Sequence, residues 1–270
     1  MIRDITIGQY YPSNSKLHRL DPRVKIMCTL FYLISLFLFQ NIWGYLAATA
    51  FLAFVIRISK VPFKHIVKGL KPIIMLLMIT VVFNLFLNNT GTVLVKFWVL
   101  QITTEGLRTA VFMAIRLIYL ILGSSLMTFT TTPNALTDGI ESILRPLEKI
   151  KVPVHEIAMM MSIALRFIPI LLEETDNIMK AQIARGADLE SGNIIKKAKA
   201  MIPILVPLLV AAFRRANDLA MAMEARCYRG GEGRTMMKPL VYEGRVYMAY
   251  AITCFYVVVA VIVGNISIPF

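Results

Sequence analysis

Residues 26–56 read IMCTLFYLISLFLFQNIWGYLAATAFLAFVI, a run without a single charged side chain. One membrane-spanning helix needs only about 20 apolar residues, so this run is long enough to cross a bilayer more than once. Gln40 and Asn41 stand near its middle, where polar residues predict a tight turn. The run therefore predicts two transmembrane helices, at about residues 24–39 and 42–58.

Three more segments have the length and apolar character of spans. Residues 72–95 predict a third span, which the turn formers at 88–91 end; residues 107–129 predict a fourth, and residues 246–270 a fifth. Hydrophobic residues occupy 57% of the 270 positions, whereas soluble domains have about 45 to 50%, and the mean hydropathy is +0.68. The fold class predicted is an all-α integral membrane protein with about five transmembrane helices.

The distribution of Lys and Arg predicts the orientation, because short loops rich in these residues stay in the cytoplasm. Arg19, Arg23 and Lys25 precede the first span, and residues 57–71 between the second and third spans are also strongly basic. The segment 88–106 carries only Lys96 as a cation. We therefore expect the N-terminus in the cytoplasm and the C-terminus outside.

The segment between the fourth and fifth spans is hydrophobic, yet charged residues and prolines interrupt its apolar runs. Apolar residues recur at helical spacing over 168–183 and again over 208–223, with charged residues on the opposite faces, and a shorter helix is expected over 133–149. This pattern predicts amphipathic helices on the cytoplasmic side. The predicted organisation is a membrane domain (1–130), a cytoplasmic helical domain (131–244) and a C-terminal transmembrane helix (245–270).

Both long amphipathic helices end in a similar triplet. The first reads Ala184, Arg185, Gly186, and the second, 41 positions later, reads Ala225, Arg226, Cys227. A single triplet of this kind is most simply a helix C-cap, since glycine takes the left-handed conformation that closes a last turn. An arginine there also offers a planar fork that can hold a carboxylate in two places. The repetition favours a pair of docking points for partner proteins.

No pattern indicates catalysis or metal binding on this chain. His18, His65 and His155 are scattered, the three cysteines have no paired spacing, and the glycine-rich segment 230–235 lacks the lysine of a phosphate-binding loop. No cofactor is expected, and an energy source must lie on another protein. Arg116, inside the fourth span, needs polar company such as Asn84 or a partner subunit.

Two other functions remain as alternatives. A self-contained secondary transporter would need inverted repeats and polar residues at the midplane of broken helices, and neither pattern is evident. The net charge of +13 also allows a membrane scaffold that binds anionic lipid or nucleic acid, with binding that falls steeply with salt. Topology explains the basic residues more simply, so no nucleic-acid partner is expected.

The block before the first span contains Ser15, Leu17, His18, Leu20, Asp21, Pro22, Arg23 and Lys25. Together with the two Ala-Arg helix ends, this block resembles the transmembrane T component of energy-coupling factor (ECF) transporters, the EcfT/CbiQ family. The resemblance covers nearly the whole chain.

The resemblance implies a prokaryotic cell-membrane complex for uptake of a vitamin or a transition-metal ion. In it, this subunit joins two ABC-type ATPases, which bind ATP and Mg, to a membrane-embedded substrate-binding S component. It also implies that Arg185 and Arg226, helped by Ala184, Gly186 and Ala225, enter grooves on the two ATPases from the ends of coupling helices. Cys227 departs from the glycine usual in the family, which leaves the close backbone approach at the second contact open.

Overall fold

The computed structural model describes residues 10–39, 41–87, 92–97, 100–187, 194–231 and 241–265. Gln40, the turn formers at 88–91 and residues 232–235 of the glycine-rich segment lie outside these ranges. The chain divides into two compact units. The bundle unit comprises Gly8–Gly139 and Leu240–Phe270, and the long-helix unit comprises Met1–Ile7 and Ile140–Pro239.

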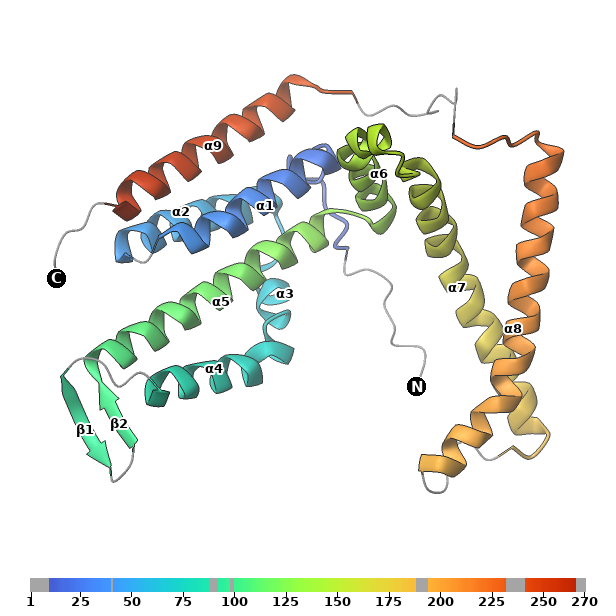
Figure 1. Cartoon of the computed structure of the whole chain (residues 1–270), viewed down its shortest axis with the longest axis horizontal. Coiled ribbons are helices and arrows are strands. Elements are labelled where there is room, and N and C mark those ends of the chain that lie inside the picture. Colours follow the sequence, from blue (N-terminus) through green and yellow to red (C-terminus); the bar gives the residue numbers. More distant parts are fainter. Residues whose placement is uncertain are drawn as a thin grey trace. The chain divides into compact units, whose positions relative to one another are not determined.

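The bundle unit contains most of the predicted spans (Figure 1). Its elements, in chain order, are α1 (Pro22–Leu38), α2 (Ile42–Ser59), α3 (Phe63–Lys68), the short 3-10 helix η2 (Lys71–Ile73), α4 (Ile74–Leu87), strands β1 (Val93–Phe97) and β2 (Leu100–Thr103), α5 (Thr104–Thr130) and α9 (Gly244–Asn265). Helix α6 (Pro133–Leu144) lies at the boundary between the units.

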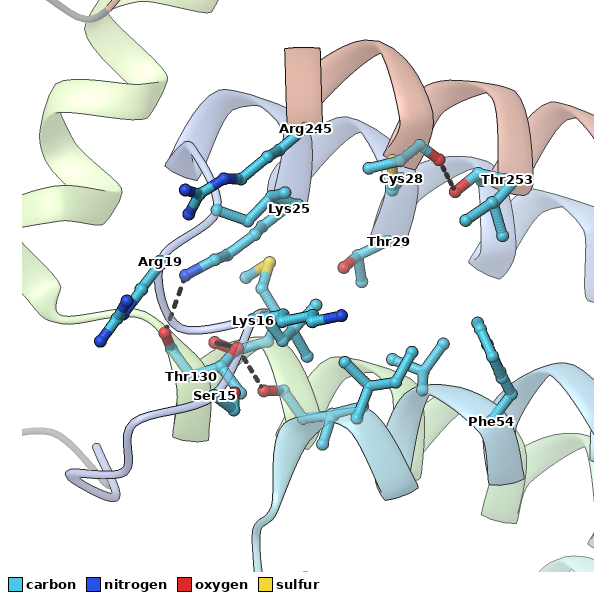
Figure 2. Close-up of a pocket in the computed structure, with 18 of the residues that line it drawn as sticks. Ser15, Lys16, Arg19, Lys25, Cys28, Thr29, Phe54, Thr130, Arg245 and Thr253 are labelled. Atoms are coloured by element: carbon cyan, nitrogen blue, oxygen red, sulfur yellow. Dashed lines mark hydrogen bonds between the residues drawn. The ribbon is translucent and has the colours of Figure 1, made fainter. Parts of the chain in front are cut away.

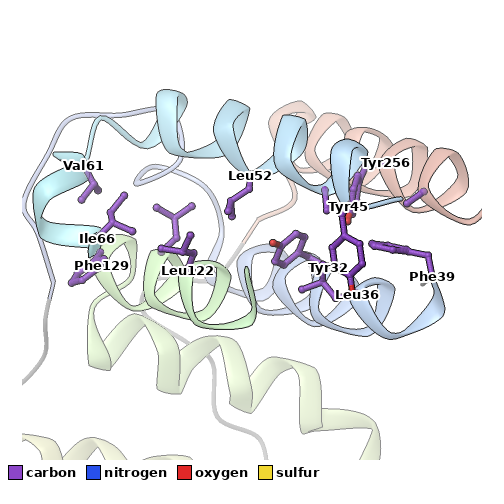
Figure 3. Close-up of a cluster of buried hydrophobic side chains, with 13 residues drawn as sticks. Tyr32, Leu36, Phe39, Tyr45, Leu52, Val61, Ile66, Leu122, Phe129 and Tyr256 are labelled. Carbon is purple, nitrogen blue, oxygen red and sulfur yellow. The ribbon is translucent and has the colours of Figure 1, made fainter. Parts of the chain in front are cut away.

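Helices α1, α2, α5 and α9 form the core of the bundle unit, with α1 and α2 each packed against both α5 and α9. Large side chains from all four meet there, as Figure 3 shows for Tyr32, Tyr45, Leu122 and Tyr256. A Cβ atom on Gly123 of α5 would lie 2.5 Å from the Tyr32 ring. The absence of a side chain at this position therefore lets α5 approach α1 closely.

Five helices of the described chain are long and apolar enough to cross a membrane: α2, α5, α7 (Val154–Ala184), α8 (Ile194–Ala225), for which the apolar stretch is Lys199–Ala225, and α9. The predicted all-α membrane fold is thereby confirmed. This set nevertheless differs from the predicted spans, because it includes α7 and α8, which are long and apolar enough to cross a membrane. Of the apolar windows in these five helices, those in α7 and α8 are the least buried, at 11% and 6% against 22 to 28% for the others. The cytoplasmic position of residues 131–244 stays a prediction.

The predicted third span is shorter than its apolar run. Helix α4 ends at Leu87 and is 14 residues long, which is about 21 Å at 1.5 Å per residue. The hydrocarbon layer is about 30 Å thick, so α4 does not cross it as one continuous helix. The last residues of the run, 93–95, lie in β1, which pairs with β2 in an antiparallel hairpin; sequence periodicity did not predict these strands.

The long-helix unit contains the 3-10 helix η3 (Arg145–Ile150), α7 and α8, and α7 packs against α8. The two long amphipathic patterns fall inside α7 and α8, which begin well before them. Both helices contain proline, Pro169 in α7 and Pro203 and Pro207 in α8. Proline removes a backbone hydrogen bond and bends a helix, which explains why the sequence predicted shorter pieces.

Candidate docking site at the two helix ends

The end of α7 is closed by a glycine in the left-handed region. Gly186 has a φ of 86°, and its N–H donates to the carbonyl of Ile183 at 2.9 Å. The N–H of Ala187 donates to the carbonyl of Gln182 at 3.0 Å. This pair of bonds is the Schellman motif, in which the residue after the cap turns left-handed and satisfies the last free carbonyls. Arg185 is the cap residue itself.

The end of α8 has the same geometry with a different residue at the turn. Cys227 has a φ of 55°, and its N–H donates to the carbonyl of Glu224 at 2.8 Å. The N–H of Tyr228 donates to the carbonyl of Met223 at 3.0 Å. Arg226 therefore occupies the same cap position as Arg185. The departure from glycine at 227 leaves the turn itself unchanged.

The candidate site residues all lie at the protein surface. Arg185 and Arg226 are exposed, as are Ala184, Gly186, Ala225 and Cys227. No atom of the described chain lies within 4 Å of a Cβ built on Gly186. A cation near the C-terminus of a helix is favourable because the last carbonyls give that end a partial negative charge. The two arginines are therefore presented in equivalent, accessible positions, while their role in docking stays a prediction.

An ion pair joins the two helices at matched positions. Arg215 Nη2 of α8 donates to Glu174 Oε2 of α7 at 3.0 Å. Glu174 lies 11 residues before Arg185, and Arg215 lies 11 residues before Arg226. Each helix thus extends from the ion pair to its arginine by about 16 Å. This pair was not predicted from the sequence, although its two residues are 41 positions apart, the same spacing as that of the two triplets.

The segments from the ion pair to the helix ends differ from the rest of α7 and α8. We call them the distal arms, residues 174–184 and 215–225. All three prolines lie on the N-terminal side of the ion pair, so both distal arms keep an unbroken hydrogen-bond ladder. In Figure 1 α7 and α8 run in opposite directions along each other. The two capped ends therefore lie at opposite ends of the helix pair.

The N-terminal motif forms a network of hydrogen bonds in the bundle unit. Neutral His18 has both ring nitrogens engaged, since Nε2 donates to the carbonyl of Tyr11 at 2.9 Å and Nδ1 accepts from Ser15 Oγ at 2.6 Å. Burial lowers the pKa of His18; the hydrogen bond to Tyr11 opposes this shift and the Lys25 charge adds to it. These contacts fix the loop that enters α1.

The motif also begins α1 and joins it to α5. Asp21 caps α1, with its carboxylate accepting from the N–H of Arg23 at 2.9 Å, and Pro22 opens the first turn. Lys25 Nζ donates to the carbonyls of His18 and Thr130 at 3.1 and 2.9 Å. Leu17 packs against the core, and Leu20 is half-buried. The motif therefore organises the bundle unit.

Arg116 of α5 has its hydrogen-bond partners within the bundle unit. Its Nε donates to Tyr45 Oη at 3.1 Å and its Nη2 to the carbonyl of Phe39 at 3.4 Å. The Phe37 ring lies 5.5 Å from the guanidinium carbon. The predicted partner Asn84 instead donates to the carbonyl of Thr80 within α4. Arg116 does have polar partners, as predicted, but Asn84 is not the partner that the hydrogen bonds show.

Comparisons with known proteins agree with these features. The family model described as CbiQ, cobalt transport protein, matches residues 13–237. A relative from Clostridium kluyveri, named energy-coupling factor transporter transmembrane protein EcfT, is 58% identical over 92% of this chain and 93% of its own length. Proteins of the same name from Ruminiclostridium cellulolyticum and Bacillus subtilis are 58% and 46% identical, over 89% and 91% of this chain and 90% and 92% of their own lengths. The predicted family is confirmed: the chain belongs to the CbiQ family and is the transmembrane component of an energy-coupling factor transporter.

Proposed function

We propose that this chain couples two ABC-type ATPases to a membrane-embedded S component that binds a vitamin or a transition-metal ion. Arg185 and Arg226 are the contacts to the two ATPases, one arginine for each. The observation that carries this proposal is the equivalence of the two helix ends. Both have the same Schellman cap, the same exposed arginine and the same 11-residue distance from the Glu174–Arg215 ion pair.

Two equivalent ends suit a pair of homologous partners. The distal arms run in opposite directions from the ion pair, so their ends are separated by about 33 Å if the arms are straight. Two similar ATPase subunits can each receive one end at that separation without competing for the same surface. An arginine fork binds a carboxylate in two places, so each end can be held in one orientation.

Force on the arginines would reach the membrane part through the distal arms. ATP and Mg bind and react on the ATPases, and closure of these subunits changes the distance between the two helix ends. The distal arms contain no proline, so they move as rigid levers, while bending concentrates at Pro169, Pro203 and Pro207. Movement of α7 against α8 then changes the surface offered to the S component, which is a lever-driven form of alternating access.

The proposal includes an orientation. The N-terminus and the long-helix unit face the cytoplasm, where the ATPases are, and the C-terminus lies outside the cell membrane. The Lys and Arg residues of the segments 16–25 and 57–71 and of the long-helix unit support this orientation. This chain takes no part in ATP hydrolysis and binds no cofactor of its own.

A double substitution tests the docking role. Replacing Arg185→Ala together with Arg226→Ala in the full transporter is expected to release the ATPases and to stop ATP-driven uptake. Each buried, charge-paired contact contributes about 2 to 5 kcal/mol, so loss of both leaves no stable complex. The measurements are co-purification of the ATPases with the tagged chain and substrate uptake into membrane vesicles.

The matched control removes two other exposed arginines from the same two helices. Arg166→Ala with Arg214→Ala keeps the same residue types and net charge change, and both side chains are exposed. This control is expected to retain the ATPases. If the Arg185 and Arg226 double variant also retains them, the docking assignment is wrong.

A further inference from the structure

A pocket of about 710 Å³ lies within the bundle unit. Its walls come from the start of α1, the second half of α2, the end of α5 and the first half of α9, and residues 14–20 line it as well (Figure 2). Ligand pockets have volumes of about 300 to 1,000 Å³, so the space is large enough for a small ligand or for part of a lipid. The pocket lies where these four helix ends meet.

One part of this pocket is apolar. Phe51, Phe54 and Val55 of α2, Leu126 of α5, and Met248 and Ile252 of α9 line it. None of these side chains offers a hydrogen bond to a ligand, so this part of the pocket favours a hydrocarbon group.

The other part of the pocket is cationic. Lys16, Arg19, Lys25 and Arg245 line the pocket, and none of the described lining residues is acidic. Figure 2 draws Arg19, Lys25 and Arg245 at one end of the pocket and Phe54 and Thr253 at the other, with Lys16 between them. Arg245 also has an exposed partner, since its Nε lies 3.7 Å from Glu243 Oε2. Arg19 and Lys25 therefore give this end of the pocket a net positive charge.

Lys25 makes the strongest case for an anionic ligand. The residue is only 6% exposed, and its ammonium uses two of three N–H donors on the neutral carbonyls of His18 and Thr130. The nearby Asp21 carboxylate is engaged by the cap of α1 and by Arg23 at 3.3 Å. A buried charge is costly unless an opposite charge compensates it. An anion at the cationic end of the pocket would supply that compensation.

We infer that this pocket binds one molecule of an anionic phospholipid. Its phosphate lies among Arg19, Lys25 and Arg245, and one acyl chain lies along Phe51, Phe54 and Ile252. The pocket thus matches an amphiphile at both of its ends. The site is separate from the two helix ends, since it lies wholly in the bundle unit.

The position of the pocket favours a lipid over a soluble anion. Lys25 and Arg245 stand in the first turns of α1 and α9, and Thr130 ends α5, so the cations lie where apolar helices leave the hydrocarbon layer. Phospholipid headgroups occupy this depth, and each basic residue near an anionic membrane surface contributes about a fivefold gain in affinity. A zwitterionic headgroup carries its own cation, which the cations at this end of the pocket repel.

A lipid titration of the purified full-length chain tests the inference. Phosphatidylglycerol, phosphatidylcholine with the same acyl chains, and inorganic phosphate are added separately to the delipidated chain in nonionic detergent. Native mass spectrometry counts the retained molecules, and thermal unfolding reports their effect. Phosphatidylglycerol is expected to be retained at one molecule per chain and to raise the melting temperature, whereas the other two are expected to do neither.

Two pairs of variants locate the binding. The rim variant Lys16→Gln, Arg19→Gln, Arg245→Gln removes three exposed cations of the pocket and is expected to weaken phosphatidylglycerol binding about 100-fold. Its matched control, Arg57→Gln, Lys64→Gln, Lys71→Gln, removes three exposed cations that do not line the pocket. Filling the apolar part with Ala249→Phe is expected to abolish retention, while Ala251→Phe, exposed outside the pocket, retains the lipid.

Each contrary result overturns a stated part of the inference. Equal retention of phosphatidylcholine, or stabilisation by inorganic phosphate alone, excludes an anionic phospholipid as the specific ligand. Equal effects within either pair of variants place any bound lipid elsewhere. If the rim variant does not fold, the single variant Arg19→Gln, compared with Arg57→Gln, decides the same point.

Discussion

Gly186 and Cys227 hold the same backbone position at the ends of α7 and α8, although only one of them is a glycine. Both have positive φ values, 86° and 55°, and both donate to the carbonyl three residues earlier. A side chain in this region clashes with the following carbonyl at a cost of about 1 to 2 kcal/mol. The second helix end therefore keeps the shape of the first against a local cost.

This comparison predicts opposite effects for two substitutions. Gly186→Ala should lower the free energy of unfolding by about 1 kcal/mol, and Cys227→Gly should raise it by up to about 1 kcal/mol, because strain is added in one case and removed in the other. Thermal unfolding in detergent measures both. Gly244→Ala is the control, since Gly244 has open space and no left-handed backbone, and its melting temperature should not fall. A loss for Cys227→Gly would contradict the strain argument.

The lowered pKa of His18 predicts that the stability of the folded chain depends on pH. Burial and the Lys25 charge lower its pKa from the ordinary value of 6.5, against the Tyr11 hydrogen bond. The unfolded chain therefore binds a proton before the folded chain does as the pH falls. The stability contributed by neutral His18 is complete above 6.5 and is lost as the pH falls from there through the lowered folded value.

The expected result is a drop in melting temperature between about pH 7.5 and about pH 5.5 that is smaller in His18→Gln. His65→Gln, at an exposed histidine, should keep the full drop. If His18→Gln falls as steeply as the unmodified chain, another group causes the pH dependence.

Between the two long helices, the Glu174–Arg215 ion pair joins α7 to α8. Both side chains are about one third exposed, so the pair itself contributes at most about 1 kcal/mol. We propose that its position matters more than its strength, because it lies 11 residues before the arginine at each helix end and so keeps the two distal arms equal in length. Sliding one helix by a turn would make the arms unequal.

A charge reversal tests this role. Glu174→Arg alone places two cations together and should lower uptake while ATP hydrolysis by the complex continues. Adding Arg215→Glu restores an opposite pair and should restore uptake. Vesicle uptake and ATP hydrolysis are measured in parallel. If the double variant transports no better than Glu174→Arg, the crossing is not what the ion pair controls.

Helix positions were predictable where composition alone decides them. The predicted spans 42–58 and 107–129 match α2 and α5 closely, because long apolar runs with turn formers at their ends leave little choice. Val93–Phe97 and Leu100–Thr103 pair as two short strands, and in the sequence they look like the end of a span. The helices α7 and α8 continue through their prolines, since only the local backbone bonds are lost there, so the sequence underestimated their lengths.

The repeated motif of the candidate site could be predicted from the sequence. The backbone conformation and the long-range contacts of the functional residues could not. The two Ala-Arg triplets stand out by spacing, but the left-handed turn at Cys227 contradicts the usual preference for glycine. The partners of Arg116 come from α1 and α2, contacts of long sequence separation that no local pattern contains. For the same reason, the cations of residues 16–25 and Arg245 could be placed in one pocket only from the fold.

At the scale of the whole molecule, the chain separates a membrane bundle from a pair of long helices. The N-terminal motif belongs to the first and the two capped ends to the second. We propose that the bundle unit anchors the chain, that the long-helix unit transfers force, and that each capped end contacts a different ATPase subunit.

Crosslinking in the assembled transporter tests whether each capped end contacts a different ATPase subunit. A photoreactive amino acid replaces Lys180 or Met221, which are exposed and lie five residues before Arg185 and Arg226, so the docking residues stay intact. Each single substitution is expected to give an adduct with one ATPase subunit, and the chain with both should give an adduct with two. If both positions give adducts only with lipid or with the S component, the capped ends do not dock on the ATPases.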